Sequence, residues 1–241
     1  MLDVGQGDAF LLQTPHNQFV LIDTGATDQV IRELSGTLPF LHRSLDYIFL
    51  SHEDKDHIGG YLAIHDAYTI DHVFSNGQER TTTVAQQTRA SFKDSIHHTL
   101  HLGDSVSIDG VDIKVLWPDR KASPDDDPNT FSIVLLITYN NLNMVFTGDA
   151  PHAVEVAIQK EIPEKIEILK VGHHGAKTST LPEFIQHIQP RIALISAGKN
   201  NRYGHPTAQT LKTLQSVNTK IYGTKEEGRV RIECNLSCEV I

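Results

Sequence analysis

Short apolar runs, some alternating with polar positions, recur along the chain and predict β-strands. A first set lies in the N-terminal part, at Ala9–Gln13, Phe19–Ile22, Tyr47–Leu50, Val111–Leu116, Phe131–Thr138 and Asn143–Thr147. A second set follows at Ile166–Lys170, Ile192–Ser196, Lys220–Tyr222 and Val230–Cys234. Apolar positions at helical spacing predict helices at Thr27–Leu34, Gly59–Ala67, Pro151–Lys160, Leu181–Ile188 and Thr207–Gln215. Two strand-rich halves with interspersed helices favour two packed sheets flanked by helices over one parallel sheet.

The composition is that of a globular protein, with 39% hydrophobic and 21% charged residues among 241. A chain of this length can bury a full core without crosslinks, so we expect one domain over residues 1–241, in two pseudo-symmetric halves. No apolar run approaches the ~20 residues of a membrane helix, and the N-terminus lacks the features of a signal peptide. Cys234 and Cys238 would lie about 13 Å apart on one strand, so we expect no disulfide between them.

The segment from Ser51 to Gly60 carries the strongest chemical signal of the sequence. It directly follows the apolar run Tyr47–Leu50 and ends in two glycines that open a predicted helix. Four potential ligands stand within six residues: His52, Asp54, Asp56 and His57. Imidazole and carboxylate groups are good ligands for divalent metals, and four of them suit two ions better than one. A polar turn with solvated side chains is the alternative interpretation.

Three further apolar runs end in residues of the same kind. Asp23 follows one strand, Asp149 follows another, and the pair His173-His174 follows a third. A carboxylate can bridge two cations, so we interpret Asp149 as the bridge. Each position also has an ordinary structural explanation, since an Asp after a strand often caps a helix and a His often satisfies a backbone carbonyl. Their recurrence at strand ends favours a metal site.

This pattern resembles the signature His-X-His-X-Asp-His of the metallo-β-lactamase superfamily, with its distant Asp and His ligands. More narrowly, the sequence is similar to the C-terminal hydrolase domain of the ComEC family of DNA-uptake channels. The similarity runs from residue 2 to about residue 235, through Asp3–Asp8, Leu21–Gly25, Ser51–Gly60, Phe146–Asp149, Leu169–Ser179, Ser196–Gly198 and Tyr203–Pro206. It implies a four-layer αββα sandwich of the α/β (α+β) class, a dinuclear metal site and hydrolysis of a phosphodiester, with DNA as substrate.

The resemblance also implies a role for each candidate residue. The first metal would be held by His52, Asp54 and Asp149, and the second by Asp56, His57, Asp149 and His173. His174 could exchange roles with His173, which we favour because it is the first residue beyond the strand. Asp23 would orient ligand histidines by accepting their other ring N–H.

Asp56 and His205 are the residues that we expect to take part in catalysis. His205 would touch the phosphate or protonate the leaving oxygen. Its place before Pro206 is also that of a plain helix-entry residue.

Two departures from the superfamily pattern affect the choice of metal. Asp54 replaces the second histidine of the signature, and no histidine precedes the run Phe131–Thr138, where Asn129 or Ser132 is the nearest substitute. The first site is therefore rich in oxygen, which favours Mn²⁺, while Zn²⁺ or Mg²⁺ is possible. We expect two divalent ions as the cofactor.

The charge of the chain is unevenly distributed. Residues 1–164 carry 10 Lys and Arg against 24 Asp and Glu, whereas residues 165–232 carry 11 against 4. We interpret the basic part as the partner of an anionic ligand, although such blocks are more often solvated surface. The phosphate- or DNA-binding residues that we expect are Lys177, Ser179, Lys199, Arg202 and Tyr203, the last by stacking on a base. The net charge of −9 argues against tight, non-specific DNA binding.

Three functions are compatible with these features. The first is a metal-dependent phosphodiesterase or nuclease, degrading the DNA strand that is not imported during natural transformation. The second is a free-standing metallo-hydrolase of small phosphodiesters, esters or lactams. The third is a catalytically inert structural domain of the DNA channel. The ligand set and the basic half favour the first, with weakly bound single-stranded DNA and the channel portion of a parent protein as partners.

The N-terminal segment bears on cofactor and location. Gly5-Gln6-Gly7-Asp8 precedes a predicted strand rather than a helix, so we interpret it as a tight turn between strands and expect no nucleotide cofactor. The abrupt beginning at Met1 suggests a domain excised from a longer protein, with a short free-standing protein as the alternative. We expect a soluble domain, membrane-attached and extracytoplasmic in the first case and cytoplasmic in the second.

Overall fold

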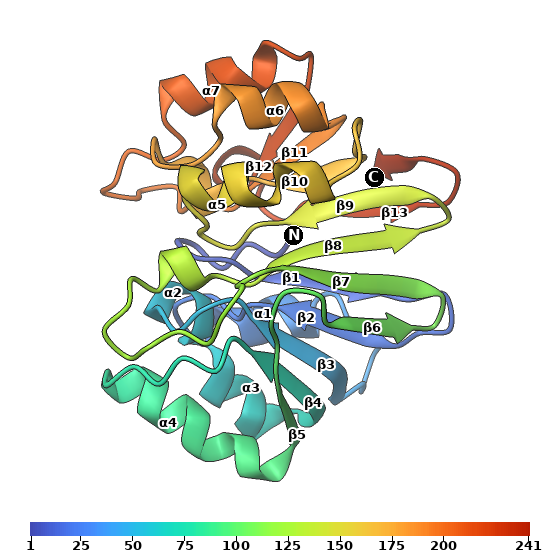
Figure 1. Ribbon diagram of the computed structural model, residues 1–241. Helices are drawn as coiled ribbons and strands as arrows, with labels where there is room; N and C mark the ends of the chain where they lie inside the picture. Colours follow the sequence, from blue (N-terminus) through green and yellow to red (C-terminus); the bar gives the residue numbers. More distant parts are fainter.

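Two large β-sheets form the centre of the computed structural model, which describes residues 1–241 (Figure 1). The strands of the first sheet are β1 (Phe10–Gln13), β2 (Phe19–Ile22), β3 (Ser44–Leu50), β4 (Thr69–Ser75) and β5 (Ile96–Thr99), in that order. Those of the second are β6 (Ser105–Ile108), β7 (Val111–Trp117), β8 (Val134–Tyr139), β9 (Leu142–Phe146), β10 (Ile168–Lys170), β11 (Ile192–Ile195) and β12 (Lys220–Gly223), in the order β12-β11-β10-β9-β8-β7-β6. A separate hairpin consists of β13 (Ile232–Cys234) and β14 (Cys238–Val240).

Each large sheet combines a parallel and an antiparallel part. Strands β2 to β5 are parallel with β1 antiparallel at the edge, while β9 to β12 are parallel and β6 to β9 are antiparallel. Parallel neighbours need crossover connections, and helices supply most of them. The helices are α1 (Gln29–Ser35), α2 (Lys55–Ile58), α3 (Tyr61–Ala67), α4 (Thr83–Ser91), α5 (His152–Ile158), α6 (Pro182–Ile188), α7 (Ala208–Gln215) and α8 (Thr224–Glu227). Short 3₁₀ turns occupy Phe92–Asp94, Asn129–Phe131, Gln159–Glu161 and Gly172–Gly175.

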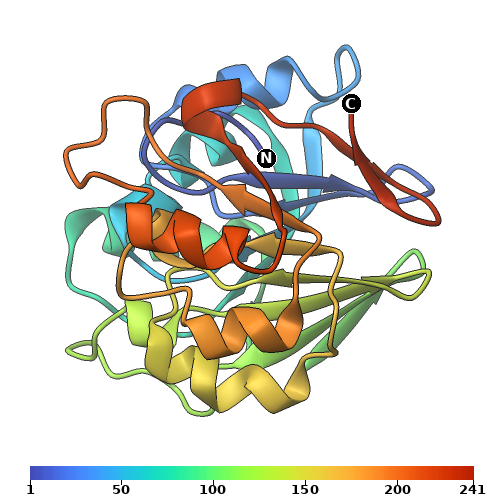
Figure 2. The same cartoon turned by 90° about the horizontal axis from the view of Figure 1, so that it is seen from above.

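Three hydrophobic cores divide the molecule into four layers. The central core lies between the sheets and joins side chains such as Phe49 and Phe74 to Val115 and Ile137. A second core lies between the first sheet and helices α1, α3 and α4, and a third lies between the second sheet and helices α5, α6 and α7. Figures 1 and 2 show these two groups of helices on opposite outer faces. The predicted sandwich of two sheets flanked by helices is confirmed.

The predicted helix Gly59–Ala67 begins two residues later in the structure, as α3, and a separate short helix, α2, precedes it. Helix α2 ends at Ile58, and α3 begins at Tyr61. A Cβ atom on Gly59 would lie 2.3 Å from the carbonyl oxygen of Ala26, and one on Gly60 would lie 2.2 Å from that of Thr24. The two glycines therefore let this segment pass directly against the loop after β2, which fixes the position of the residues before them.

Other boundaries differ where local patterns are weak. The predicted strand Phe131–Thr138 begins only at Val134, because Asn129–Phe131 forms a 3₁₀ turn. The apolar pattern did not predict β4, β5, β6, β14, α2, α4 or α8. Helix α4 buries only Ala85, Thr88 and Ser91, so it offers little hydrophobic periodicity.

Two expectations about the chain ends were wrong. Cys234 ends β13 and Cys238 begins β14, so they face each other across a hairpin and form a disulfide, with Cα atoms 4.0 Å apart. The expectation failed because it placed both cysteines on one strand. Gly5–Asp8 does not connect two strands, since no strand precedes β1. No helix of the structure has the length and apolar character needed to cross a bilayer.

Candidate metal centre

The candidate ligands meet where strands of both sheets end. Asp23 follows β2, the segment from His52 to His57 follows β3, Asp149 follows β9, and the histidine pair follows β10. Because parallel strands present their carboxyl ends at one edge, residues far apart in sequence converge there. His57, Asp149 and His174 are buried at this meeting point.

His57 is held in a fixed orientation by Asp23. The carboxylate Oδ2 of Asp23 lies 2.7 Å from Nδ1 of His57, while its Oδ1 accepts the backbone N–H of Ser51 at 2.7 Å. The hydroxyl of Ser51 also donates to Asp23 Oδ2, at 2.7 Å. The opposite ring nitrogen, His57 Nε2, points to Asp149 Oδ1 at 3.3 Å. The resemblance implies this orienting position for Asp23.

His52 presents its Nε2 to the same point. Its Nδ1 lies 3.0 Å from the hydroxyl of Ser51 and 3.2 Å from that of Ser132. Ser132 also accepts the backbone N–H of Asp149 at 3.1 Å, so it positions two ligand candidates at once. Asn129 lies on the neighbouring 3₁₀ turn with a buried, unpaired Oδ1.

The paired histidines occupy different environments. His174 is 1% exposed, and its Nε2 lies 3.2 Å from Asp56 Oδ2 and 3.5 Å from Asp149 Oδ2. The side chain of His173 is 29% exposed, and its Nε2 lies 3.8 Å from Asp149 Oδ2. Both backbones are left-handed, with φ of 49° for His173 and 55° for His174, so the turn sends the second ring inward. The structure thus brings His174 into the cluster and leaves His173, the ligand expected from the sequence, at its rim.

Asp54 lies at the outer side of the cluster. Its Oδ2 is 3.7 Å from His52 Nε2, and its Oδ1 accepts a hydrogen bond from the guanidinium of Arg80. Arg80 in turn donates its backbone N–H to Glu53, which also pairs with Arg89. None of these three residues was expected to have a role at the site: Glu53 stands inside the ligand segment, and the only signal of Arg80 and Arg89 is charge in polar segments.

Asp8 and Lys170 are two further charged residues of the site that the sequence analysis missed. They form an ion pair in which both side chains are 1% exposed. Lys170 Nζ also lies 3.5 Å from Asp149 Oδ1, and Asp8 Oδ1 lies 3.3 Å from His174 Nδ1. One signal could have found Lys170: a lysine at the end of a wholly buried strand.

The charges of the cluster perturb its titration. Burial acts to lower the pKa of His174, but Asp149 and Asp8 raise it to about 10. Against the same effect of burial, Asp149 and Asp23 hold the pKa of His57 well above its usual range. Burial and the neighbouring His57 lower the pKa of His52 well below its usual range. The metal-free cluster therefore stores protons on two of its histidines, which metal binding must displace.

A divalent metal fits this donor set. His52 Nε2, His57 Nε2 and Asp149 Oδ1 are buried without hydrogen-bond partners, and each of these three residues offers a ligand atom within 4.8 Å of the other two. Asp56, His57 and His174 also offer ligand atoms within 4.8 Å of one another, although the Asp56 and His174 side chains are paired with each other in the metal-free structure. A buried polar atom without a partner costs about 1–3 kcal/mol, so several directed at one point indicate a place for a cation.

A cleft of about 440 Å³ opens beside Asp56. We call it the metal-site cleft; its walls are Gln6, Ala26, Lys55, Asp56, Asn200, Asn201, Arg202 and Tyr203. Asn201 stabilises the loop that supplies Asn200 to Tyr203 to the cleft, since its amide donates to the carbonyls of Gly198 and His205. Tyr203 is 56% exposed, and the guanidinium of Arg202 lies 5.3 Å from its ring centre.

The other expected phosphate-binding residues are placed differently. Lys177 and Lys199 do not line the metal-site cleft. Ser179 is buried, and its hydroxyl donates to the carbonyl of Gly172 at 2.6 Å, so it stabilises the histidine turn. Lys55 lines the cleft instead and was not expected there, although it stands inside the ligand segment.

His205 lies between the cleft and the cluster. Its ring centre is 5.7 Å from that of Tyr203 and 5.9 Å from that of His173. Its Nδ1 is buried without a partner, and burial together with His173 lowers its pKa. This environment favours the neutral form of the His205 imidazole, which can still donate one hydrogen bond.

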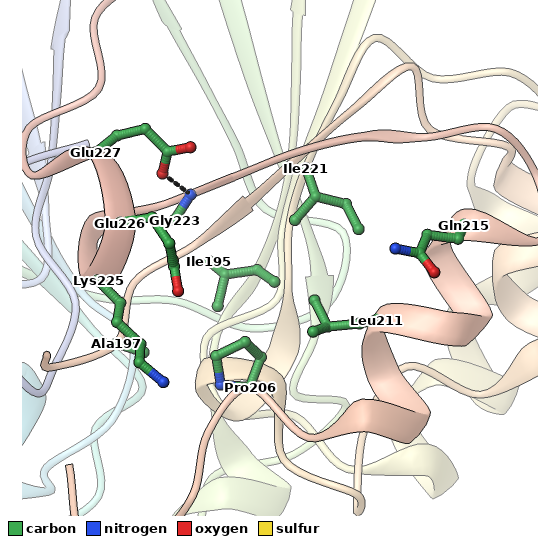
Figure 3. Close-up of a pocket in the computed structure, with 10 residues that line it drawn as sticks. All are labelled: Ile195, Ala197, Pro206, Leu211, Gln215, Ile221, Gly223, Lys225, Glu226 and Glu227. Carbon is green, nitrogen blue, oxygen red and sulfur yellow. Dashed lines mark hydrogen bonds between the residues drawn. The ribbon is translucent and has the colours of Figure 1, made fainter. Parts of the chain in front are cut away.

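A second cavity, of about 220 Å³, lies between α7, α8 and the ends of β11 and β12 (Figure 3). Its apolar wall includes Ile195, Leu211 and Ile221. Glu227 at its rim accepts the backbone N–H of Gly223 at 2.8 Å, so this carboxylate has a structural partner. None of the candidate metal ligands lines this cavity.

Solved structures with the same architecture include the metallo-beta-lactamase fold protein YhfI from Bacillus subtilis. It superposes with a TM-score of 0.61 at 14% identity, over 90% of this chain and 88% of that one. Zn(2+)-bound PqqB from Methylobacterium extorquens gives 0.57 at 8% identity, over 90% and 85%. At identities this low, the superpositions show a shared fold and nothing about function.

Curated relatives match nearly the whole chain. ComE operon protein 3 of Bacillus subtilis is 33% identical over 257 residues, covering 96% of this chain and 32% of the relative. Recombination protein 2 of Haemophilus influenzae is 29% identical, covering 96% and 28%, and Competence protein ComA of Neisseria gonorrhoeae is 28% identical, covering 95% and 31%. The chain thus spans about a third of the length of these relatives.

The family model of the metallo-beta-lactamase superfamily matches residues 2–199. This range includes the ligand segment after β3, Asp149 and the histidine pair. The resemblance inferred from the motifs is confirmed, and the chain belongs to the metallo-β-lactamase superfamily.

Proposed function

We propose that this chain is a dinuclear metal-dependent phosphodiesterase that cleaves single-stranded DNA. One observation carries the proposal: three buried ligand atoms without hydrogen-bond partners, on His52, His57 and Asp149, lie beside a cleft whose walls include two cations. Lys55 and Arg202 supply those cations, and the guanidinium of Arg202 donates to the hydroxyl of Tyr203 rather than to an acidic group. A neutral ester or lactam needs no such cations.

The donor groups divide into two sets around Asp149. We assign His52, Asp54 and Asp149 to the first metal, and Asp56, His57, Asp149 and His174 to the second. His174 replaces the His173 of the sequence-based assignment because it is buried among Asp56, Asp149 and Asp8. The more exposed His173 then faces the substrate side, next to His205.

Divalent ions held by these residues would supply activation of the attacking water and positive charge to offset the charge that develops on the phosphate. The residues of this chain orient the ligands and bind the substrate. Asp23 fixes His57 through Nδ1, so that Nε2 is free to bind. Lys55 and Arg202 hold phosphates that flank the scissile one, and Tyr203 offers its exposed ring to a base. His205 donates a hydrogen bond to the phosphate or to the leaving oxygen.

The proposed donors favour Mn²⁺ over Zn²⁺. Each site combines imidazole with carboxylate, and Asp54 stands where a histidine would give a nitrogen-rich first site. Carboxylate ligands suit Mn²⁺ and Mg²⁺, whereas imidazole ligands suit Zn²⁺. Arg80 also binds Asp54 and leaves one of its oxygens for the metal.

The names of two relatives connect the proposal to DNA handling. One is a competence protein and another a recombination protein. Because the chain spans about a third of their length, we propose that it acts as one domain of a longer protein of DNA uptake. In that setting it would degrade the strand that is not imported, and the channel portion would deliver the DNA, offsetting the weak affinity expected from a net charge of −9.

The proposal is tested by measuring metal content together with cleavage of labelled single- and double-stranded DNA under Mn²⁺, Mg²⁺ and Zn²⁺. We expect two equivalents of metal and cleavage of single strands, fastest with Mn²⁺. Asp149→Asn should lose bound metal and at least about a hundredfold in rate, because it removes the shared charge. Asp112→Asn, at an exposed carboxylate, is the matched control.

Two results would contradict the proposal. If Asp149→Asn retains two equivalents and full activity, the bridging assignment is wrong. If the wild type binds metal but cleaves only a lactam or a carboxylic ester, the scaffold serves the small-substrate function.

A further inference from the structure

Lys170 is a fully buried lysine in the middle of a sheet. It ends β10, which lies between β9 and β11, and the whole strand is buried. The side chain is 1% exposed, and a charge so deep in a protein is stable only when it is paired. If this position served packing alone, an apolar residue would give the protein equal or greater stability than a buried ion pair.

The ammonium group contacts three oxygens on one side of the cluster. It is paired with the carboxylate of Asp8, donates to the carbonyl of Gly148, and lies 3.5 Å from Asp149 Oδ1. Oxygen atoms of two carboxylates and a carbonyl are also what a metal cation would seek. Lys170 therefore occupies the position of a cation beside Asp149.

Asp8 lies within reach of the proposed ligand histidines. Its Oδ1 is 3.3 Å from His174 Nδ1, and its Oδ2 is 3.8 Å from His57 Nδ1. Its backbone is fixed by a hydrogen bond from its N–H to the carbonyl of Asp56, at 3.1 Å. Gly7 allows this approach, because a Cβ there would lie 2.2 Å from the same carbonyl oxygen.

Asp8 also belongs to two of the four groups of donors that could hold a metal. One combines Asp8 with Asp23 and His57, and the other with Asp149 and His174. Without a neighbouring cation, Asp8 would thus be a further carboxylate competing for the metals.

We propose that Lys170 is an internal cation that occupies the Asp8 side of the cluster, confines the metals to the side of His52, Asp54 and Asp56, and sets their affinity. The inference rests on the metal site of the proposed function. Lys170 and Asp8 are positioning residues, because they act on the metals through Asp149 and the histidines. Removing the ammonium leaves an uncompensated carboxylate and strengthens metal binding. Removing the carboxylate charge leaves an uncompensated ammonium and weakens it.

The test compares Lys170→Met, Asp8→Asn and the double variant of this chain. Mn²⁺ and Zn²⁺ dissociation constants are measured by competition with a chromophoric chelator, and the metal-induced shift in Tm is recorded. We expect Lys170→Met to bind about tenfold more tightly and Asp8→Asn about tenfold more weakly, the lower end of the range for residues that contact metal ligands. The double variant removes both charges and should return close to the wild type. Lys220→Met, at an exposed lysine, is the control.

Opposite directions in the two single variants are the signature of a charge effect. A purely structural role would lower the Tm of the metal-free and metal-loaded forms equally and leave the dissociation constants unchanged, which overturns the inference. Shifts in the same direction overturn it as well. If Lys170→Met alone does not fold, the inference is tested by comparing Asp8→Asn with the double variant, in which both charges are removed. Asp8→Asn must then have the weaker metal affinity. If the wild type binds neither metal, the proposed function itself fails.

Discussion

Replacing Asp23 by Asn should weaken metal binding although Asp23 is not a proposed ligand. Asp23 Oδ2 lies 2.7 Å from His57 Nδ1, and a carboxylate can only accept, so Nδ1 carries the proton. When metal binding displaces the other ring proton, the ring offers its Nε2, which is buried, has no hydrogen-bond partner and is directed toward Asp149. An Asn amide in place of Oδ2 would donate instead and favour the tautomer with its proton on Nε2, where the metal must bind.

The size of the effect follows from the hydrogen bonds involved. Asn can still accept the backbone N–H of Ser51, which lies 2.7 Å from Oδ1, so the loop after β3 should keep its shape. The lost contact is a hydrogen bond to a charged group, worth about 1.5–3 kcal/mol. Because about 1.4 kcal/mol corresponds to a tenfold change in an equilibrium constant, affinity should fall about 10- to 100-fold.

Chelator competition measures the affinity, and nitrogen NMR of the imidazole reports the tautomer. Asp46→Asn is a matched control, since Asp46 also accepts a backbone N–H, from Phe19 at 2.7 Å, and is not part of the cluster. If Asp23→Asn binds metal as tightly as the wild type, or if the tautomer is unchanged, the orienting role is refuted.

Three further predictions concern protons, metal choice and substrate. His57 and His174 hold protons in the metal-free cluster, with the pKa of His174 raised to about 10, so metal affinity should rise as pH rises from about 6 to about 9, about tenfold per unit for each proton displaced. Asp54→His should move the preference from Mn²⁺ toward Zn²⁺, because it adds nitrogen to the first site. Lys55→Ala and Arg202→Ala should each raise KM for DNA several-fold and reduce the salt slope by about one, while turnover of a bis-nitrophenyl phosphate stays unchanged.

Each of these has an opposing result. Isothermal titration in buffers of different ionisation enthalpy would show no proton release if the histidines were already neutral. Identical metal profiles for the wild type and Asp54→His would remove the argument from oxygen donors. Equal losses on DNA and on the small substrate would mean that Lys55 and Arg202 shape the metal centre. Lys177→Ala and Lys199→Ala should have smaller effects on DNA than Arg202→Ala, since neither lysine lines the metal-site cleft.

The sequence by itself determined the layered architecture and the segments that hold the candidate ligands. Strands with strong apolar patterns, such as Phe19–Ile22, were predicted with their observed bounds. The ligand segment after β3 was found because strand, polar loop and glycines are contiguous, so a local pattern suffices. Short or polar elements such as β5 and α4 escaped prediction, because their stability comes from packing against neighbours rather than from their own periodicity.

Only the tertiary structure decided how the strand ends combine. Sequence order favoured His173, but two left-handed residues in succession turn His174 inward to Asp56, 118 positions away. The tertiary structure also pairs Asp8 with Lys170, joins Cys234 to Cys238 across a hairpin, and brings Lys55 to the same cleft as Arg202. Such pairs depend on where the backbone carries each side chain. Local propensity describes single segments, whereas charge pairing and ligand geometry are properties of segments that meet only in the folded chain.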